Sequence, residues 1–148
     1  MDWIYYKSFS KISAEHLYAL LKLRQDVFII EQDCIYNDLD GLDQDSSHLL
    51  GFVDEELAMY ARIVPAGIKF DEVSIGRIVV NPKHRNLGLG KALVKKSLHL
   101  LKKSGERNVR IEAQAHLENF YQSMGFTKTS SEYEVDSIPH IQMLCMLT

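Results

Sequence analysis

The stretch VVNPKHRNLGLGK, residues 79–91, decides how this chain is expected to fold. An apolar run over residues 73–80 leads into it and predicts a buried β-strand, which the Asn-Pro pair stops. After Gly88 and Gly90, apolar residues recur at helical spacing as far as Ser104. A strand, a glycine-containing loop and a long helix therefore follow one another directly.

The loop in this stretch has the properties of a phosphate-binding turn. Helix N-termini present unpaired N–H groups and the positive end of the helix dipole, and both favour phosphate. Glycine lets the backbone approach a pyrophosphate closely, and Arg85 and Lys91 add positive charge. On spacing alone, a plain basic loop remains the alternative, because short glycine motifs often match by chance.

Two other phosphate motifs are excluded. A Walker loop needs Gly five residues before its Gly-Lys pair and Ser or Thr after it, whereas this chain has Arg85 and Ala92 there. A dinucleotide-binding loop needs a small residue where this chain has Leu93. ATP and NAD are therefore not expected as ligands.

The patterns on either side extend this unit into an α/β fold. Alternating residues, turn signals and helical spacing give the order β-α-β-β-β-α-β-α-β-β. The expected strands are 3–8, 48–53, 57–64, 73–80, 109–113, 127–135 and 141–147. Three helices are expected. The first runs from a Ser13 cap through Phe28, the second from the glycine-containing loop 85–90 to Ser104, and the third over 117–124. Residues 31–46 are expected to form a loop or a short helix. The unit from 73 to 113 predicts a parallel strand pair with a right-handed crossover.

Length and composition predict one globular domain over residues 1–148. Hydrophobic residues make 46% of the chain and charged residues 25%, which argues against disorder. With 17 basic and 20 acidic side chains the net charge is −3, so no nucleic-acid partner is expected. No apolar run approaches the ~18–20 residues that span a bilayer, and the N-terminus lacks a signal-peptide layout, so no membrane partner is expected. The two cysteines fit a reducing compartment, and the expected location is cytoplasmic.

Two motifs together resemble the signatures of the GNAT superfamily of N-acetyltransferases. The first is Arg85-x-x-Gly88-x-Gly90 between a strand and a helix, and the second is NFYQSMGF, residues 119–126. Four more segments are similar to the ElaA-type branch, at 27–32, 40–43, 113–116 and 138–141. The resemblance implies an α/β fold with a mixed, mostly antiparallel sheet flanked by helices. It also implies a splayed parallel strand pair at the coenzyme A site.

The same resemblance implies which residues hold acetyl-CoA, the donor substrate. The backbone of Ile78, Val79 and Val80 would pair with the pantetheine arm like an added strand. Beside Arg85, the turn would hold the pyrophosphate through the backbone of Asn86, Leu87, Gly88, Leu89, Gly90 and Lys91. Gln114 stands where many family members have an Asn that contacts pantetheine, and it offers the same amide groups on a longer arm.

By the same resemblance, Tyr121 would stand near the coenzyme A sulfur. It would protonate the leaving thiolate after an amine attacks the thioester carbonyl. A tyrosine with a pKa of ~10 can act as the acid for a leaving thiolate whose thiol has a pKa of ~8.5. A strand N–H of Ile78 or Val80 can stabilise the oxyanion. The alternative role for Tyr121 is that of a core aromatic beside Phe120 and Phe126.

The attacking amine must also lose a proton, and four side chains are candidate bases. Glu31 and His140 border the acceptor site by analogy with the family and are the first choices. Glu112 and His48 are further candidates. A solvated charge or a structural hydrogen bond is the alternative role for each of them.

Charge is distributed unevenly along the chain. Residues 31–56 hold nine acidic side chains and no Lys or Arg, so this flank would attract a cationic amine while the basic turn attracts phosphates. A solvated loop is the alternative. Arg62 and Arg77 fall in predicted strands and need either a salt bridge or a substrate carboxylate. The spacing over 38–49 fails the EF-hand pattern and the six histidines lack ligand spacing, so no metal is expected.

The sequence therefore predicts an acetyl-CoA-dependent N-acetyltransferase that moves acetyl directly to an amine. A small-molecule amine is the first expectation for the acceptor, and a protein N-terminus or lysine is the second. The alternatives are a non-catalytic acyl-CoA-binding sensor, which would not need Tyr121, and an acyl-CoA-using synthase of signalling lactones. An exposed strand edge at 141–147 would also allow a homodimer.

Overall fold

One sheet of eight strands organises the protein, and the computed structural model describes residues 1–148. The strands lie in the order β1-β2-β3-β4-β5-β8-β6, and β7 pairs with β8. Their bounds are β1 Asp2–Tyr6, β2 Ser47–Val53, β3 Glu56–Val64, β4 Val73–Val80, β5 Asn108–Gln114, β6 Phe126–Lys128, β7 Tyr133–Val135 and β8 Ile138–Met146. All neighbouring pairs are antiparallel except β4 and β5. The predicted mixed, mostly antiparallel sheet is confirmed.

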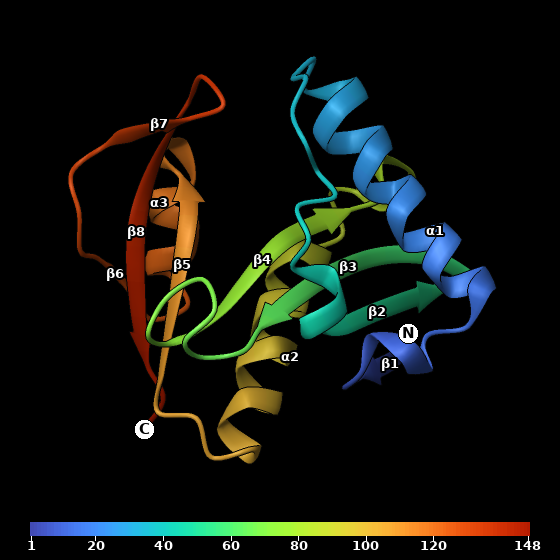
Figure 1. Ribbon diagram of the computed structural model, residues 1–148, viewed down its shortest axis with the longest axis horizontal. Coiled ribbons are helices and arrows are strands. Elements are labelled where there is room, and N and C mark those ends of the chain that lie inside the picture. Colours follow the sequence, from blue (N-terminus) through green and yellow to red (C-terminus); the bar gives the residue numbers. More distant parts are fainter.

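Helices cover both faces of this sheet (Figure 1). α1, Ala14–Arg24, contributes Leu20 to one apolar cluster, and α2, Leu89–Lys103, contributes Leu93 to the other. The neighbouring β2 residues Leu49 and Leu50 belong to different clusters, as the alternation of side chains along a strand requires. The short α3, Glu118–Gln122, lies on the α2 face, where Tyr121 packs in the same cluster as Leu93. The sheet is thus buried on both sides at its centre.

β4 and β5 are hydrogen-bonded neighbours over only two residue pairs, Val73–Val109 and Ser74–Arg110. Beyond them β4 contains a bulge, because the register with β3 shifts so that Arg77 and Ile78 together face one residue, Ala61. Arg77 adopts a left-handed φ of 49° there. A bulge bends and twists its strand, and the two strands diverge beyond this point (Figure 1). The β5-facing edge of β4 is therefore left without a neighbouring strand.

Local signals in the sequence account for most element ends. Ser13 caps α1, with its hydroxyl accepting the His16 N–H at 3.2 Å. The predicted hairpin between β2 and β3 is confirmed. Its turn residues Asp54 and Glu55 both have positive φ, 49° and 66°, which is the geometry of the two-residue turn that usually carries Gly. None of the helices is long and apolar enough to cross a bilayer.

Two expectations for the C-terminal strands were wrong. The single strand expected over 127–135 is divided into β6 and β7, because the polar segment 129–132 separates two short pairings on the long β8. The exposed edge expected at 141–147 does not exist either, since β8 pairs with β5 on one side and with β6 and β7 on the other. A homodimer through this edge has no structural basis.

The end of the first helix also differs from the expectation. Residues Gln25–Glu31 continue α1 as a π-helix rather than as an ordinary α-helix. Short π-helical turns occur mostly inside α-helices and frequently at functional sites. This segment places Phe28 on one wall of the cavity described next, and Glu31 near the predicted coenzyme A loop.

Candidate active site

A cavity of about 280 Å³ occupies the gap between the diverging strands β4 and β5. Ser74 to Ile78 of β4 form one wall, and Ile111 to Gln114 of β5 form the other. Tyr121 of α3 and His140 of β8 complete the β5 side, while residues of the segment 32–36 close the β4 side. The cavity is thus produced by the same divergence that leaves the edge of β4 unpaired.

The predicted phosphate turn lies where β4 ends and α2 begins. Asn86 and Gly88 both adopt left-handed φ values, 67° and 73°, and Gly88 precedes the helix without a side-chain cap. The first N–H groups of α2 therefore have no capping side chain. A Cβ placed on Gly90 would meet Phe120 and Val80 only at ordinary contact distances, 3.7 and 3.8 Å. Packing within the protein thus does not demand glycine at position 90, whereas close approach of a ligand to the backbone would.

Arg85, which precedes this turn, is paired with Glu31 of the π-helix. The guanidinium donates to both carboxylate oxygens, at 2.6 and 2.8 Å. This bidentate hydrogen bond lowers the pKa of Glu31. Glu31 does not line the cavity. The structure therefore places this first-choice base beside the residue that precedes the predicted phosphate turn, apart from His140 and Glu112.

Tyr121 is buried yet reaches the cavity. Its ring packs edge-on against Phe120 and Phe126, with centroid distances of 5.1 and 5.7 Å. Its hydroxyl has no hydrogen-bond partner within the protein, although the residue lines the cavity. Burial raises the pKa of Tyr121 to about 12, so the hydroxyl stays protonated at neutral pH. Tyr121 is thus the core aromatic that the sequence offered as one of its two roles. Its unpartnered hydroxyl is compatible with the other role, that of an acid, which stays a prediction.

The two histidines among the candidate bases differ in position, since His48 lies outside the cavity and His140 lines it. His48 is fully buried away from the cavity, where Nδ1 lies 2.7 Å from the Tyr60 hydroxyl and Nε2 lies 2.9 Å from the Asp43 carbonyl oxygen. His140 lines the cavity, and its Nδ1 lies 2.7 Å from the carbonyl oxygen of Ile138. Because a carbonyl only accepts, Nδ1 carries the proton in this contact and a neutral His140 keeps a lone pair on Nε2.

Glu112 also lines the cavity, and each of its carboxylate oxygens accepts a hydrogen bond from another side chain. Lys69, from the loop between β3 and β4, lies 3.1 Å from Oε1, and the Tyr133 hydroxyl donates to Oε2 at 2.8 Å. Burial raises the pKa of Glu112, but Lys69 and Tyr133 outweigh it and the net pKa is lowered. The group is therefore a carboxylate at neutral pH. Gln114 lies two residues further along β5, opposite His140, and also lines the cavity.

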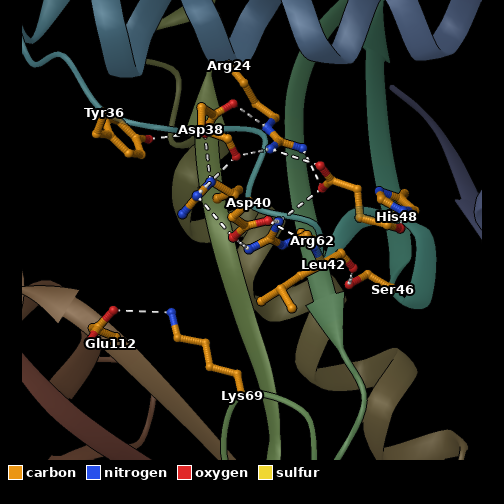
Figure 2. Close-up of polar contacts among 12 residues, drawn as sticks. Arg24, Tyr36, Asp38, Asp40, Leu42, Ser46, His48, Arg62, Lys69 and Glu112 are labelled. Carbon is orange, nitrogen blue, oxygen red and sulfur yellow. Dashed lines mark hydrogen bonds and ion pairs between the residues drawn. The ribbon is translucent and has the colours of Figure 1, made fainter.

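The acidic segment does not form the open negative flank that the sequence suggested. Asp38, Asp40 and Asp43 pair with three arginines of the helix and the sheet (Figure 2). The distances are 2.9 Å for Arg24–Asp38, 2.7 Å for Arg24–Asp43, 2.8 Å for Arg62–Asp40, 3.0 Å for Arg62–Asp43, 2.7 Å for Arg77–Asp38 and 3.3 Å for Arg77–Asp40. Three positive and three negative charges cancel here. Of the two roles left open for Arg62 and Arg77, the structure shows the salt bridge.

This ion-pair network, Arg24, Arg62 and Arg77 with Asp38, Asp40 and Asp43, fixes the segment that forms one cavity wall. Tyr36 is held by it twice, because its hydroxyl donates to Asp38 at 3.1 Å and Arg77 lies over its ring at 5.5 Å. Sequence reasoning missed Tyr36, and it also missed Lys69 and Tyr133. The one available signal was that buried arginines in strands require nearby carboxylates. No cluster of three or more His, Cys, Asp or Glu is arranged to hold a metal ion.

Comparison with known proteins places the fold in a family. The sequence profile described as an acetyltransferase (GNAT) domain matches residues 12–147. The chain belongs to the GNAT acetyltransferase family. This confirms the resemblance read from the two motifs, and it makes the protein an enzyme of the N-acetyltransferase type.

Particular relatives narrow this further to the ElaA-like branch. Protein ElaA of Escherichia coli K12 is 44% identical over 137 residues, which cover 90% of each chain. The crystal structure of E. coli ElaA matches with a TM-score of 0.88, at 41% identity over 97% of this chain and 98% of that one. An acyl-CoA N-acyltransferase from Pseudomonas aeruginosa matches with a TM-score of 0.91, at 37% identity over 97% and 98%. An aminoglycoside 6′-N-acetyltransferase in complex with coenzyme A shares the fold alone, at 14% identity, a TM-score of 0.75, and coverage of 100% and 98%.

Proposed function

We propose that the protein transfers the acetyl group of acetyl-CoA directly to the amine of a small molecule, with donor and acceptor bound together. The observation that carries this is the cavity between β4 and β5, with Tyr121 and His140 on its wall. The β4 strand that lines it leads, through residues 81–88, to the uncapped N-terminus of α2. The crystallised relative bound to coenzyme A supports the choice of donor. Because the acceptor reacts at the thioester, both substrates must meet in this one cavity.

The donor is proposed to lie along the unpaired edge of β4. The backbone of Ile78, Val79 and Val80 would pair with the pantetheine arm as an added strand does. The turn from Asn86 to Lys91 would hold the pyrophosphate through backbone N–H groups, since the positive end of α2 favours an anion there. Gln114, across the gap, would offer its side-chain amide to the same arm.

The reaction forms one C–N bond and breaks one C–S bond. The amine nitrogen attacks the thioester carbonyl carbon, and a backbone N–H of Ile78 or Val80 would stabilise the oxyanion. The departing thiolate would accept a hydrogen bond from the Tyr121 hydroxyl and would then take its proton from solvent, so that Tyr121 stays protonated throughout. Since the pKa of Tyr121 is about 12 and that of a thiol is near ~8.5, full proton transfer to the sulfur is uphill. The hydroxyl therefore acts mainly by stabilising the developing charge.

The proton released by the amine is proposed to pass to Nε2 of His140. This atom is unprotonated in the neutral tautomer that the Ile138 carbonyl selects. Glu31, the other first choice, is held by Arg85 on the donor side, so the geometry favours His140. A small acceptor is proposed because the cavity volume of about 280 Å³ lies just below the range of typical ligand sites, roughly 300–1,000 Å³.

A calorimetric titration with acetyl-CoA, with coenzyme A, ATP and NAD as controls, tests the donor. Selective micromolar binding of acetyl-CoA is expected. A panel of primary amines with thiol release as the readout then tests transfer. A folded protein that binds no acetyl-CoA would remove the proposal. A protein that binds it but releases no thiol with any small amine would point to a sensor or to a protein acceptor.

A further inference from the structure

Lys69 is the only lysine on the cavity wall, and its ammonium group forms an ion pair with Glu112, a carboxylate that also lines the cavity. Its Nζ lies 3.1 Å from Oε1 of Glu112, with the two side chains 29% and 21% exposed. The same Nζ lies 5.6 Å from the centre of the Phe70 ring. Figure 2 shows Lys69 reaching to Glu112 apart from the network around Arg24 and Arg62. An alkylammonium group is thus bound in the cavity by the protein itself.

The two partners of Glu112 differ in how firmly they are held. Tyr133 comes from β7, which pairs with β8, and its hydroxyl is fixed on the second carboxylate oxygen. Lys69 comes from the connection between β3 and β4, outside any strand or helix, and its charge sits on a flexible four-carbon stem. Lys69 is therefore the partner that can leave while Tyr133 keeps the carboxylate in place.

The other cations of the cavity wall cannot exchange in this way. Arg62 contacts both Asp40 and Asp43, and Arg77 contacts both Asp38 and Asp40. Each guanidinium would have to leave two carboxylates at once, and Arg62 is almost fully buried. Two carboxylates line the cavity, Glu112 and Asp136, and only Glu112 has a cationic partner, a lysine that is partly exposed and lies outside every helix and strand. A cation from solution would restore the pairing that Lys69 gives up.

We propose that Glu112 binds the ammonium group of the acceptor and that Lys69 holds this position until the acceptor displaces it. This rests on the proposed function and specifies the acceptor as a primary alkylamine, whose ammonium on a flexible aliphatic chain matches the group it replaces. Exchange of one ammonium for another conserves charge at Glu112. A neutral aromatic amine or an anionic group would instead leave the carboxylate unpaired.

The first test is binding of a simple probe, butylamine, followed by NMR. Lys69→Met keeps the stem and removes the competing charge, so binding is expected to tighten about threefold to tenfold. Lys69→Arg retains a competing cation and is expected to give no tightening. Glu112→Gln is expected to weaken binding at least about tenfold, because a charge-assisted hydrogen bond is lost. Lys22→Met, which removes an exposed ion pair on α1, is the matched control and should change nothing.

The second test uses turnover. In Lys69→Met the KM for the amine should fall by the same factor, with little change in the KM for acetyl-CoA. A purely structural role for Lys69 would instead change the free energy of unfolding and leave the KM for the amine as it is. Butylamine binding that is unchanged or weaker in Lys69→Met would overturn the inference. Failure of the proposed function gives a different result, namely a wild-type protein that does not bind acetyl-CoA. The comparison of butylamine binding between the wild type and Lys69→Met would still test the inference in that case.

Discussion

Arg85 and Glu31 face each other in a bidentate ion pair, with N–O distances of 2.6 and 2.8 Å, outside the cavity and beside the predicted phosphate turn. The pair joins the loop before α2 to the π-helix that follows α1. The guanidinium proposed to sit beside a pyrophosphate is thus already bound to a carboxylate. An incoming phosphate must compete with Glu31 for it.

The first prediction concerns this competition. In Glu31→Gln, acetyl-CoA should bind about twofold to fivefold more tightly, which corresponds to the worth of an exposed ion pair. Calorimetry measures the change, and Glu15→Gln on α1 controls for the loss of one negative charge. Weaker binding in Glu31→Gln would show instead that the carboxylate orients Arg85 for the donor.

The second prediction concerns Tyr121→Phe. The hydroxyl has no partner within the protein, so the melting temperature should hardly change, while kcat falls about tenfold to a hundredfold. The Kd for acetyl-CoA should stay the same, because the ring keeps its packing against Phe120 and Phe126. Steady-state kinetics together with calorimetry provide the test. A variant with full kcat would remove Tyr121 from the mechanism.

The third prediction concerns the ion-pair network. Asp43→Ala leaves Arg24 and Arg62 short of a carboxylate, and both are almost fully buried. Loss of one partner from a buried ion pair costs about 3–5 kcal/mol, so urea unfolding should show a loss of that size. Asp26→Asn, which removes the exposed pair with Lys22, should cost far less. Equal losses in the two variants would show that the network is only a surface feature.

The fourth prediction concerns pH. Burial lowers the pKa of His48, although hydrogen bonding and charge from Asp43 oppose it. The unfolded chain therefore binds a proton near its ordinary pKa of about 6.5, while the folded protein resists it. Stability present above about pH 6.5 should fall as the pH is lowered toward the folded pKa, by up to about 1.4 kcal/mol per pH unit. Urea unfolding at several pH values measures this slope, and His48→Gln should abolish it.

A second loss of stability is expected in more acidic solution. Burial opposes ionisation of Asp40, yet its bonds to Arg62 hold the pKa at about 2. A folded pKa below the unfolded value of about 3.9 gives stability that is complete above that value and is lost as the pH falls through about 2. Asp43 behaves in the same direction. A flat profile below pH 4 would contradict the strength of these pairs.

Sequence patterns predict this fold well where the signals are local. The strand 73–80 and the helix ending near Ser104 follow from an apolar run, an Asn-Pro stop and glycine placement, and β4 and α2 match them closely. The π-helix over Gln25–Glu31 was not predicted, because the spacing of apolar residues over only seven positions does not distinguish a π-helix from an α-helix. β6 and β7 escaped because each is only three residues long.

The strand, turn and helix of the predicted phosphate loop follow from local motifs, but the contacts between side chains around the cavity do not. Arg24 meets Asp38 across 14 residues, and Arg77 meets the same residue across 39. Lys69 meets Glu112 across 43. No periodicity connects such positions, since they become neighbours only when the loops close over the sheet. For the same reason, the sequence alone could not show that Glu31 would meet Arg85, 54 residues away.

The seam between β4 and β5 has a mechanical consequence. Only two residue pairs join the strands there, so a rocking of the two halves of the sheet about this line would strain few hydrogen bonds. Stiffness in a sheet comes from its ladders, and regions with few of them open at low free-energy cost. The seam is joined by fewer residue pairs than any other pair of neighbouring strands in the sheet. Flexing along it would widen the cavity for product release without unfolding any strand.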